Sequence, residues 1–389
     1  MLSCQKAAFS LPEHVTYLNG AYLSPQLKSV EQVGIKALSR KSLPFELQIS
    51  DFFEPVEQLK ASYARFINAP DKDRIAIIPS VSYGIANVAN NIQLQPGDRI
   101  VMALEQFPSN FYSWKKLADH SGASLHIVLP PTSDSRTQAW NEAILDAIDA
   151  QTKLVAIANV HWADGTLFDL MAIRQKTNQF GALLVIDGTQ SVGALPIDVE
   201  ALQPDALICA GYKWLLGPYA IGLAYYGSYF DDGIPIEENW INRLNSDNFK
   251  ELVNYQPLYK PKANRYSMGE QSNFILLPML QRALEQLQDW GAANIQTYCK
   301  TISKDAVAVL KEMGCQIESE TDRCGHLFGV RLDDALFDFE KLSRIFAEEQ
   351  VYVSVRGNAI RVSPNVYNEK RDFEKLILCF EKARKKIFV

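Results

Sequence analysis

The sequence lacks the cysteine patterns that define small metal-binding or disulfide-linked proteins. Its 389 residues include six cysteines, and no two of them are spaced as in a CxxC motif. A chain of this length buries a core large enough to fold without cross-links. We therefore expect neither a zinc ribbon nor a redox CxxC pair. We interpret Cys209 and Cys379, which lie in apolar runs, as small core residues.

The chain also lacks an excess of basic residues and any long apolar run. Its formal net charge is -6, from 39 Lys and Arg against 45 Asp and Glu, and the basic residues are scattered. No apolar run approaches the length of a membrane span. The first residues, MLSCQKAAFSLPEHVTYLNG, have no long apolar core of the kind found in a signal peptide. We therefore expect a cytoplasmic protein with neither a nucleic-acid nor a membrane partner.

Several motifs of common enzyme and binding classes are missing. Neither GxGxxG nor GxxxxGK[ST] follows the first predicted strands, and GxSxG does not occur. These absences disfavour a nucleotide-binding or non-catalytic α/β protein and a hydrolase.

What the sequence does contain is an alternation of apolar runs with segments of helical spacing. The runs predict strands at 74–79, 99–104, 124–130, 153–160, 182–188 and 205–211. Strands that are apolar throughout predict a mostly parallel sheet covered by helices on both faces.

The pattern changes after about residue 235. Residues 234–265 show no periodicity and predict a long irregular connection. Beyond them we predict a smaller α+β unit with helices at 274–290, 301–313, 335–349 and 370–386 and strands at 326–332 and 351–364. We predict a large α/β domain over 16–255 and a small α+β domain formed by 1–15 and 256–389.

A carboxylate and a lysine follow two consecutive predicted strands. Asp187 ends the run 182–188, and Lys213 follows the run 205–211. Alone, each has an ordinary explanation: the aspartate caps a helix, and the lysine reaches solvent from a turn. Together, at the carboxyl edge of a parallel sheet, they fit pyridoxal phosphate, which needs a lysine for its aldehyde and an acid beside its pyridine nitrogen. The turn at 80–84, between a strand and a helix, has free N–H groups for the phosphate.

These stretches resemble the class V aminotransferase family of fold type I pyridoxal-phosphate enzymes, which includes cysteine desulfurases, kynureninases and isopenicillin-N-epimerase-like proteins. The resemblance rests first on DGTQSVGALPID (187–198) and CAGYKWLLGPYAIG (209–222). It extends over nearly the whole chain, through YLNGAYLSP (17–25), SVSYGIANVA (80–89), EQFPSNFYSW (105–114), VHWADGTLFDL (160–170), RYSMGEQSNF (265–274) and IRVSPNVYN (360–368). It implies a large domain with a mostly parallel seven-stranded sheet between helices, a smaller C-terminal α+β domain, and a homodimer.

The resemblance also implies roles for particular residues. Lys213 would form the imine with the cofactor and move the proton, and Asp187 would pair with the pyridine nitrogen. The remaining cofactor contacts would come from Gln190 at the ring hydroxyl, Phe107 on the ring face, and Val81, Ser82 and Tyr212 at the phosphate. A second subunit would add Gly269–Gln271, and with it Glu270.

The substrate contacts are implied in the same way. Arg361 would bind the α-carboxylate with its planar fork, and Arg356 is a second candidate for this role. Asn19, Gly20 and Ala21 would line the substrate entrance. His161 and Trp162 would lie near the ring, with His161 as a candidate catalytic residue.

The sequence departs from the family pattern at two places. Desulfurases carry a nucleophilic cysteine shortly before the carboxylate-binding arginine, but only residues 357–360 separate Arg356 from Arg361 and none is cysteine. Cys324 is too distant in sequence to replace it, so we disfavour desulfurase chemistry. Phe107 stands where desulfurases typically have histidine, which favours the kynureninase-like and epimerase-like members. Glu270 would repel a phosphate, so its side chain could instead face the substrate.

The expected function is a pyridoxal-phosphate-dependent enzyme acting on an α-amino acid, and an aminotransferase that also takes a keto acid is the first choice. A kynureninase-like β-lyase and an amino-acid epimerase use the same Lys213, Asp187 and Arg361 and stay open as alternatives.

Overall fold

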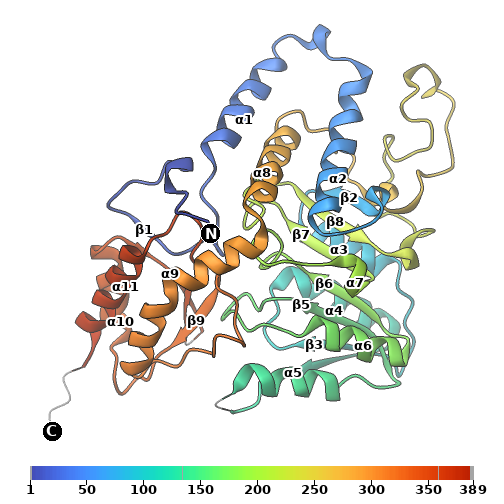
Figure 1. Cartoon of the computed structure of the whole chain (residues 1–389). Helices are drawn as coiled ribbons and strands as arrows, with labels where there is room; N and C mark the ends of the chain where they lie inside the picture. Colours follow the sequence, from blue (N-terminus) through green and yellow to red (C-terminus); the bar gives the residue numbers. More distant parts are fainter. Residues whose placement is uncertain (1, 134, 358, 386–389) are drawn as a thin grey trace.

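The centre of the molecule is a seven-stranded sheet with the spatial order β2-β8-β7-β6-β5-β3-β4. The structure is a computed structural model that describes residues 2–133, 135–357 and 359–385. Neighbouring strands are parallel except for β8, which is antiparallel to both β2 and β7. The predicted mostly parallel sheet is therefore confirmed (Figure 1). The strands are Ile75–Ile78 (β2), Arg99–Ala103 (β3), Ser124–Val128 (β4), Thr152–Ala158 (β5), Leu183–Asp187 (β6), Ala206–Ala210 (β7) and Gly222–Tyr226 (β8).

Strand β8 was not among the strands that the apolar runs predicted. It follows β7 through the loop 211–221 and pairs beside it, with Ala210 opposite Gly222. A strand that turns straight back pairs antiparallel to its predecessor. This return places Lys213 in a strand-to-strand loop at the carboxyl edge of β7.

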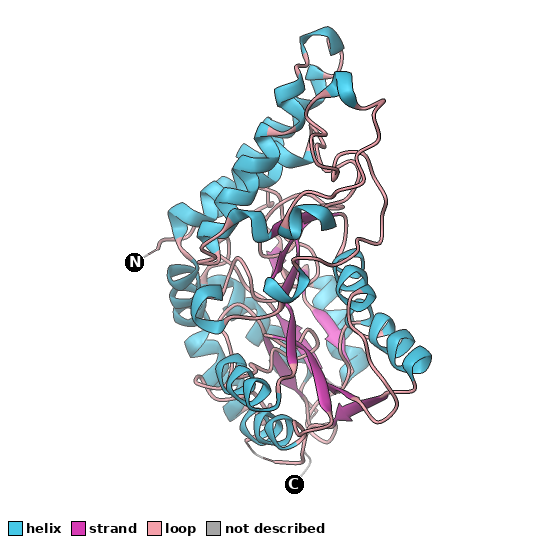
Figure 2. Cartoon of the chain, turned by 90° about the vertical axis from the view of Figure 1, so that its right-hand side faces the viewer, coloured by secondary structure: helices cyan, strands magenta, loops and turns pink. Residues whose placement is uncertain are grey.

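Helices cover both faces of this sheet, as Figure 2 shows. Alternate strand residues enter two separate apolar cores, for example Ile75 and Ile77 in one and Ala76 and Ile78 in the other. The helices Val81–Asn90 (α3) and Tyr112–Ser121 (α4) cover the second core, and Arg136–Asp146 (α5) and Leu170–Phe180 (α6) cover the first. Val199–Leu202 (α7) is a single short turn that also faces the first core.

Three helices form an extension at one end of the molecule (Figure 1). Helices Lys28–Arg40 (α1) and Glu54–Phe66 (α2) both contact Leu276–Trp290 (α8). The sequence reasoning predicted α8 but neither α1 nor α2. Helix α1 buries only Val30 and Gly34 fully, so few of its side chains belong to the core.

The C-terminal part contains a three-stranded antiparallel sheet in the order β11-β12-β9. The predicted strand at 351–364 is divided into three strands, and the helix predicted at 301–313 begins earlier. The elements are Ala292–Glu312 (α9), Phe328–Arg331 (β9), Phe339–Glu348 (α10), Val351–Tyr352 (β10), Ser354–Arg356 (β11), Ala359–Val362 (β12) and Lys370–Ala383 (α11).

The N-terminal segment lies against this C-terminal part. Strand β1 (Thr16–Tyr17) pairs in parallel with β10, and Asn19 bridges to Ser363. The segment 17–25 is thereby held close to β12, which carries Arg361. The domain division at residue 255 remains a prediction.

The irregular connection predicted at 234–265 has no α-helix or strand, only short 3-10 turns such as Lys262–Tyr266. Within the part of the chain that the structure describes, we find no helix with the length and apolar character needed to cross a membrane.

Candidate active site

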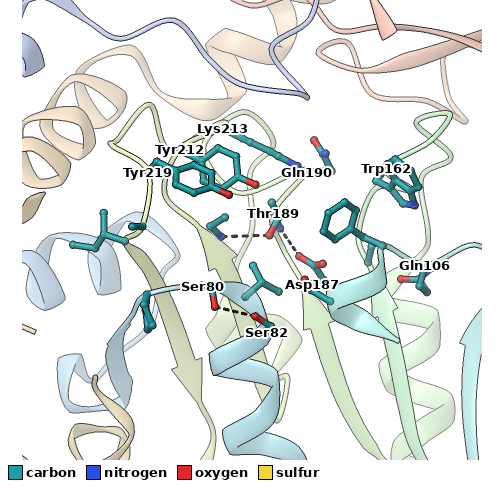
Figure 3. A pocket seen from close by; sticks show the side chains of 18 of the residues that line it. Ser80, Ser82, Gln106, Trp162, Asp187, Thr189, Gln190, Tyr212, Lys213 and Tyr219 are labelled. Carbon is teal, nitrogen blue, oxygen red and sulfur yellow. Dashed lines mark hydrogen bonds between the residues drawn. The ribbon is translucent and has the colours of Figure 1, made fainter. Parts of the chain in front are cut away.

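A cavity of about 340 Å³ opens at the carboxyl edge of the central sheet. Its walls come from the segments that follow β2, β3, β5, β6 and β7 and from the end of the loop that precedes β8. Figure 3 shows these side chains converging, with Lys213 and Tyr212 on one side and Ser80 and Ser82 on the other. This is the edge at which ligands of parallel α/β sheets bind.

Lys213 lies in the loop between β7 and β8 and is 7% exposed. The structure gives its ammonium no hydrogen bond or ion pair with any residue of 2–133, 135–357 and 359–385. Nζ lies 5.4 Å from the ring centre of Phe107 and 5.6 Å from that of Tyr212. Burial, together with the charges of Arg361 and Arg356, lowers the pKa of Lys213 to about 8, although the charge of Asp187 opposes the shift. A larger fraction of neutral amine is therefore present at neutral pH than for an ordinary lysine.

Asp187 is the last residue of β6 and is buried beside the cavity. The backbone N–H of Thr189 donates a 3.0 Å hydrogen bond to its Oδ1. Burial raises the pKa of Asp187, while the bonds from Thr189 and the charge of Lys213 act in the opposite direction. The Thr189 hydroxyl also accepts a 3.3 Å bond from the N–H of Ala210, which ties the loop after β6 to the end of β7.

The N-terminus of α3 forms the opposite wall. Ser80 caps the helix, since its hydroxyl accepts a 3.2 Å bond from the N–H of Tyr83 and lies 2.9 Å from the hydroxyl of Ser82. The N–H groups that begin a helix have no partner within it, and the helix dipole favours an anion there. Gly84 is required for this placement, because a Cβ there would lie 2.7 Å from a methyl group of Ile208 in β7.

Gln190 lines the cavity with its amide largely engaged by the protein. Its Nε2 donates to the carbonyl of Ala21 at 3.1 Å, and its Oε1 accepts from the indole of Trp214 at 2.9 Å. The indole can only donate, so the orientation of the amide is determined. One amide N–H remains for a ligand, which leaves the predicted contact with a ring hydroxyl possible.

Phe107 and Trp162 stand between this cavity and the next. Their ring centres are 5.4 Å apart in an edge-to-face arrangement. The indole N–H of Trp162 donates to the carbonyl of Glu105 at 2.7 Å, and Glu105 has the left-handed φ of 55°. Trp162 thus holds the strained turn that carries Phe107.

His161 lies outside the lining of both cavities. Its ring nitrogens lie 3.2 Å from a carboxylate oxygen of Asp164 and 3.1 Å from the carbonyl oxygen of Leu104. Asp164 also pairs with Arg136 at 2.8 Å and with Arg331. Burial alone would raise the pKa of Asp164, but His161, Arg136 and Arg331 outweigh burial and hold that pKa well below its usual value. The catalytic role of His161 remains a prediction that this geometry does not support.

A second cavity of about 480 Å³ adjoins the first and shares with it Phe107, Trp162, Tyr212, Lys213 and Tyr219. Arg361 on β12 and Arg356 on β11 line it. Arg361 is buried and donates to the carbonyl of Trp162 at 2.7 Å and to the hydroxyl of Ser354 at 3.3 Å. Burial lowers the pKa of Arg361 to about 9.

The predicted entrance residues Asn19, Gly20 and Ala21 divide into two groups. Ala21 lines the second cavity, together with Tyr22 and Leu23, which the sequence reasoning missed. Asn19 and Gly20 do not line it. The amide of Asn19 accepts from Ser354 at 2.7 Å, and the N–H of Gly20 donates to the carbonyl of Ser363 at 3.0 Å, so both fasten the segment to the C-terminal sheet.

Glu270 is exposed and lines neither cavity of the single chain. Its neighbour Gly269 donates its N–H to Glu237, which also accepts from the phenol of Tyr83 at 2.7 Å. The cofactor contact of Glu270 was expected from a second subunit and remains a prediction.

The sequence reasoning gave no role to several other lining residues, among them Gln106, Thr189 and Tyr219. Each of these three lies inside a stretch that it had already singled out: EQF, DGTQ and the loop after Lys213. Their position within these stretches was the signal in the sequence that could have identified them as lining residues.

The donor set fits pyridoxal phosphate. The cavity presents an amine without a partner, a buried carboxylate, and a helix N-terminus with two serine hydroxyls. These three features match an aldehyde, a pyridine nitrogen and a phosphate. Fold and site together define a pyridoxal-phosphate-dependent enzyme of fold type I that acts on an amino acid.

Comparisons with known proteins agree with this class. The family model described as aminotransferase class V matches residues 48–376. The chain is 27% identical to the "Uncharacterized aminotransferase YcbU" of Bacillus subtilis over 331 residues. This alignment covers 83% of this chain and 82% of that protein. It is 35% identical over 174 residues to a cysteine desulfurase of Enterobacter sp., which covers 44% of this chain and 42% of that one.

A solved structure shares the whole fold. It is that of a C-DES variant with glycine covalently linked to its PLP cofactor, and it superposes with a TM-score of 0.85 at 16% identity. The match covers 97% of this chain and 99% of that one. The chain belongs to the class V aminotransferase family. Its placement nearer to kynureninase-like members than to cysteine desulfurases remains a prediction.

Proposed function

We propose that the protein is an aminotransferase that moves the amino group of an α-amino acid to a keto acid. The observation that carries this proposal is Lys213, a buried lysine without an ionic partner, which lies between the carboxylate of Asp187 and the guanidinium of Arg361. Burying such an amine is costly unless it is used. The printed name of the relative in Bacillus subtilis supports the same reaction class.

Each group has a task that follows from its surroundings. When bound, pyridoxal phosphate supplies an aldehyde for amines and a ring that withdraws electrons. Lys213 Nζ, with its pKa near 8, would hold the cofactor through its aldehyde as the neutral amine, and it would move the proton of the substrate α-carbon. Asp187 holds a proton at the pyridine nitrogen, and Arg361 orients the substrate by its α-carboxylate.

Desulfurase chemistry has little support. It needs a nucleophilic cysteine beside the substrate, and none of the residues that line the two cavities is cysteine. Five of the six cysteines are buried, and burial raises the pKa of the Cys324 thiol to about 12. A thiol held protonated in this way is a poor nucleophile. The lyase and epimerase alternatives use the same lysine, aspartate and arginine, and Phe107 agrees with them as well, so the reaction product has to distinguish the three.

The visible absorption spectrum of the purified protein with pyridoxal phosphate tests the proposal. In the wild type we expect an absorption band in the violet. Addition of an amino acid should bleach this band and release the matching keto acid. Lys213→Ala should lose the band and reduce turnover by about 10⁴-fold or more. Lys260→Ala is the matched control, because burial also lowers the pKa of Lys260 but its ammonium lies over Phe53, away from the cavity.

Two results would contradict this proposal differently. A bound cofactor with a cleaved side chain and a shortened amino acid, or with a racemised amino acid, in place of the matching keto acid would replace transfer by β-lyase or epimerase chemistry. A wild type without the band, in cofactor-saturated protein, would overturn the role of Lys213 itself.

We also propose that the chain acts as a homodimer. Apolar side chains are exposed where α1 and α2 meet, including Phe45 at 77%, and along the irregular connection, including Tyr255 at 96%. Such surfaces favour a protein partner. Light scattering should give twice the chain mass, and a monomeric mass with full activity would refute the dimer. The cytoplasmic location remains a prediction from composition.

A further inference from the structure

Two arginines line the second cavity without an acidic partner. Neither Arg356 nor Arg361 forms an ion pair within residues 2–133, 135–357 and 359–385, and the Nε atom of each is buried without a hydrogen-bond acceptor. Elsewhere in the chain, partly buried arginines such as Arg74 and Arg99 face Asp231 and Asp149 at 2.8 and 2.7 Å. The two cavity arginines therefore have unused capacity for anions.

The two side chains share one face of the β11–β12 hairpin. Arg361 pairs directly with Ser354, and Arg356 pairs with Ala359. Ser354 and Arg356 are two residues apart on β11, so they point to the same side, and the bond from Arg361 to the Ser354 hydroxyl confirms that Arg361 does too. Diagonal neighbours of this kind are about 7–8 Å apart. Both guanidinium groups thus border one cavity from different positions.

The charge of the cavities is unbalanced toward cations. Lys213, Arg356 and Arg361 line the second cavity with no acidic residue, and Asp187 is the one carboxylate in the lining of the first. The remaining side chains of the second cavity are apolar or aromatic. With Lys213 committed to the cofactor and Arg361 to the α-carboxylate, the charge of Arg356 still lacks a counterpart.

Arg356 is also free to move toward a ligand. Its Nη1 donates to the carbonyl of its own neighbour Val355 at 2.7 Å, and its guanidinium lies 5.4 Å from the ring centre of Trp162. Its Nε has no acceptor among the described residues. Arg361, in contrast, is fixed by two hydrogen bonds.

We propose that Arg356 binds a second carboxylate, in the side chain of the substrate, and that the enzyme prefers dicarboxylic amino acids. Arg361 takes the α-carboxylate and Arg356 the distal one, with the aliphatic part of the substrate between the aromatic side chains. This inference rests on the proposed function and names the substrate class of the same site. Its competitor is a shared clamp, in which both arginines bind the single α-carboxylate.

Binding of substrate-like acids to the holoenzyme distinguishes a site for a second carboxylate from a shared clamp. Glutarate and pentanoate have five carbons each and differ in the second carboxylate. By titration calorimetry we expect glutarate to bind the wild type about 10-fold or more tightly than pentanoate. Arg356→Gln should remove that preference and leave pentanoate unchanged, and Arg356→Lys should restore part of it, because lysine keeps the charge but not the fork. Arg344→Gln on exposed α10 makes the same change in net charge and should alter neither affinity.

Turnover provides the second measurement. Arg356→Gln should lower kcat/KM for glutamate by about 100-fold and that for norvaline by less than about threefold. An equal loss for both substrates would establish the shared clamp and overturn the proposal. So would a wild type that binds both acids equally. Since the violet band and keto-acid release depend on Lys213, their presence alongside such results would show that the function holds while the substrate class fails.

Discussion

The two ends of the active site are built in different ways. The cofactor end consists of the residues that directly follow strands of one sheet: Ser80–Ser82 after β2, Asp187–Gln190 after β6 and Lys213 after β7. The substrate end joins Ala21–Leu23 from near the N-terminus, Trp162 from the middle, and Arg356 and Arg361 from the C-terminal hairpin. The first end is local to one element of the fold, and the second depends on how distant segments are brought together.

This difference has chemical consequences. The cofactor end carries charges of both signs, with the carboxylate of Asp187 and the amine of Lys213 in one lining but not in an ion pair, and a helix N-terminus that favours an anion. The substrate end carries two guanidinium groups with no acid in its lining. The cofactor end therefore offers a separate group for each part of one fixed cofactor, whereas the substrate end offers cations alone, as a site for an anionic substrate requires.

The largest expected effect breaks the cofactor end alone. Asp187→Asn keeps the shape of the residue but removes the carboxylate that holds the proton at the pyridine nitrogen. We expect kcat to fall by about 10³-fold, while the violet band and glutarate binding remain. Steady-state kinetics measure kcat, and a spectral titration follows the violet band. Equal losses of band and turnover would mean that Asp187 serves to hold the cofactor instead.

The next effect tests the contact between the two ends. Asp164 joins His161 and Arg136 of the large sheet region to Arg331 on β9, and all of these groups are buried or nearly so. Asp164→Asn leaves Arg136 without its carboxylate and Arg331 with Glu318 alone, 3.6 Å away, so we expect about 3 kcal/mol less free energy of unfolding by urea denaturation. Asp119→Asn, which breaks the exposed pair with Lys115 in α4, is the control and should cost less than about 0.5 kcal/mol. A small loss at Asp164 would show that the two regions are held together by apolar packing alone.

The same contrast explains what could be predicted from the sequence. Uniformly apolar strands and the residues at their ends identify the sheet, Asp187 and Lys213, because both depend on local order along the chain. Strand β8 and helices α1 and α2 were missed. Strand β8 is an antiparallel return directly after β7, and α1 buries only two residues fully, whereas α2 buries six and its pattern was overlooked. At the substrate end, Arg361 came from the family resemblance. The position of Tyr22 and the engaged ring of His161 depend on tertiary contacts, which no local pattern records.

The smallest effect sharpens the comparison by coupling the two ends. Lys213 reacts as the neutral amine. Below its pKa of about 8, the rate at which apoprotein takes up pyridoxal phosphate covalently should therefore fall about tenfold per pH unit, and above about pH 9 this rate should level off.

Burial is the main cause of the low pKa of Lys213, and the positive charges of Arg361 and Arg356 lower that pKa as well by disfavouring the ammonium. Removing one of these charges with Arg361→Gln should therefore raise the pKa and move the bend of the profile to higher pH, whereas the exposed Arg344→Gln should not move it. Stopped-flow absorbance from pH 6 to about 11.5 would follow the uptake. An unmoved bend in Arg361→Gln would mean that the substrate end does not tune the lysine, and a bend near 10.5 in the wild type would mean that the lysine is not desolvated at all.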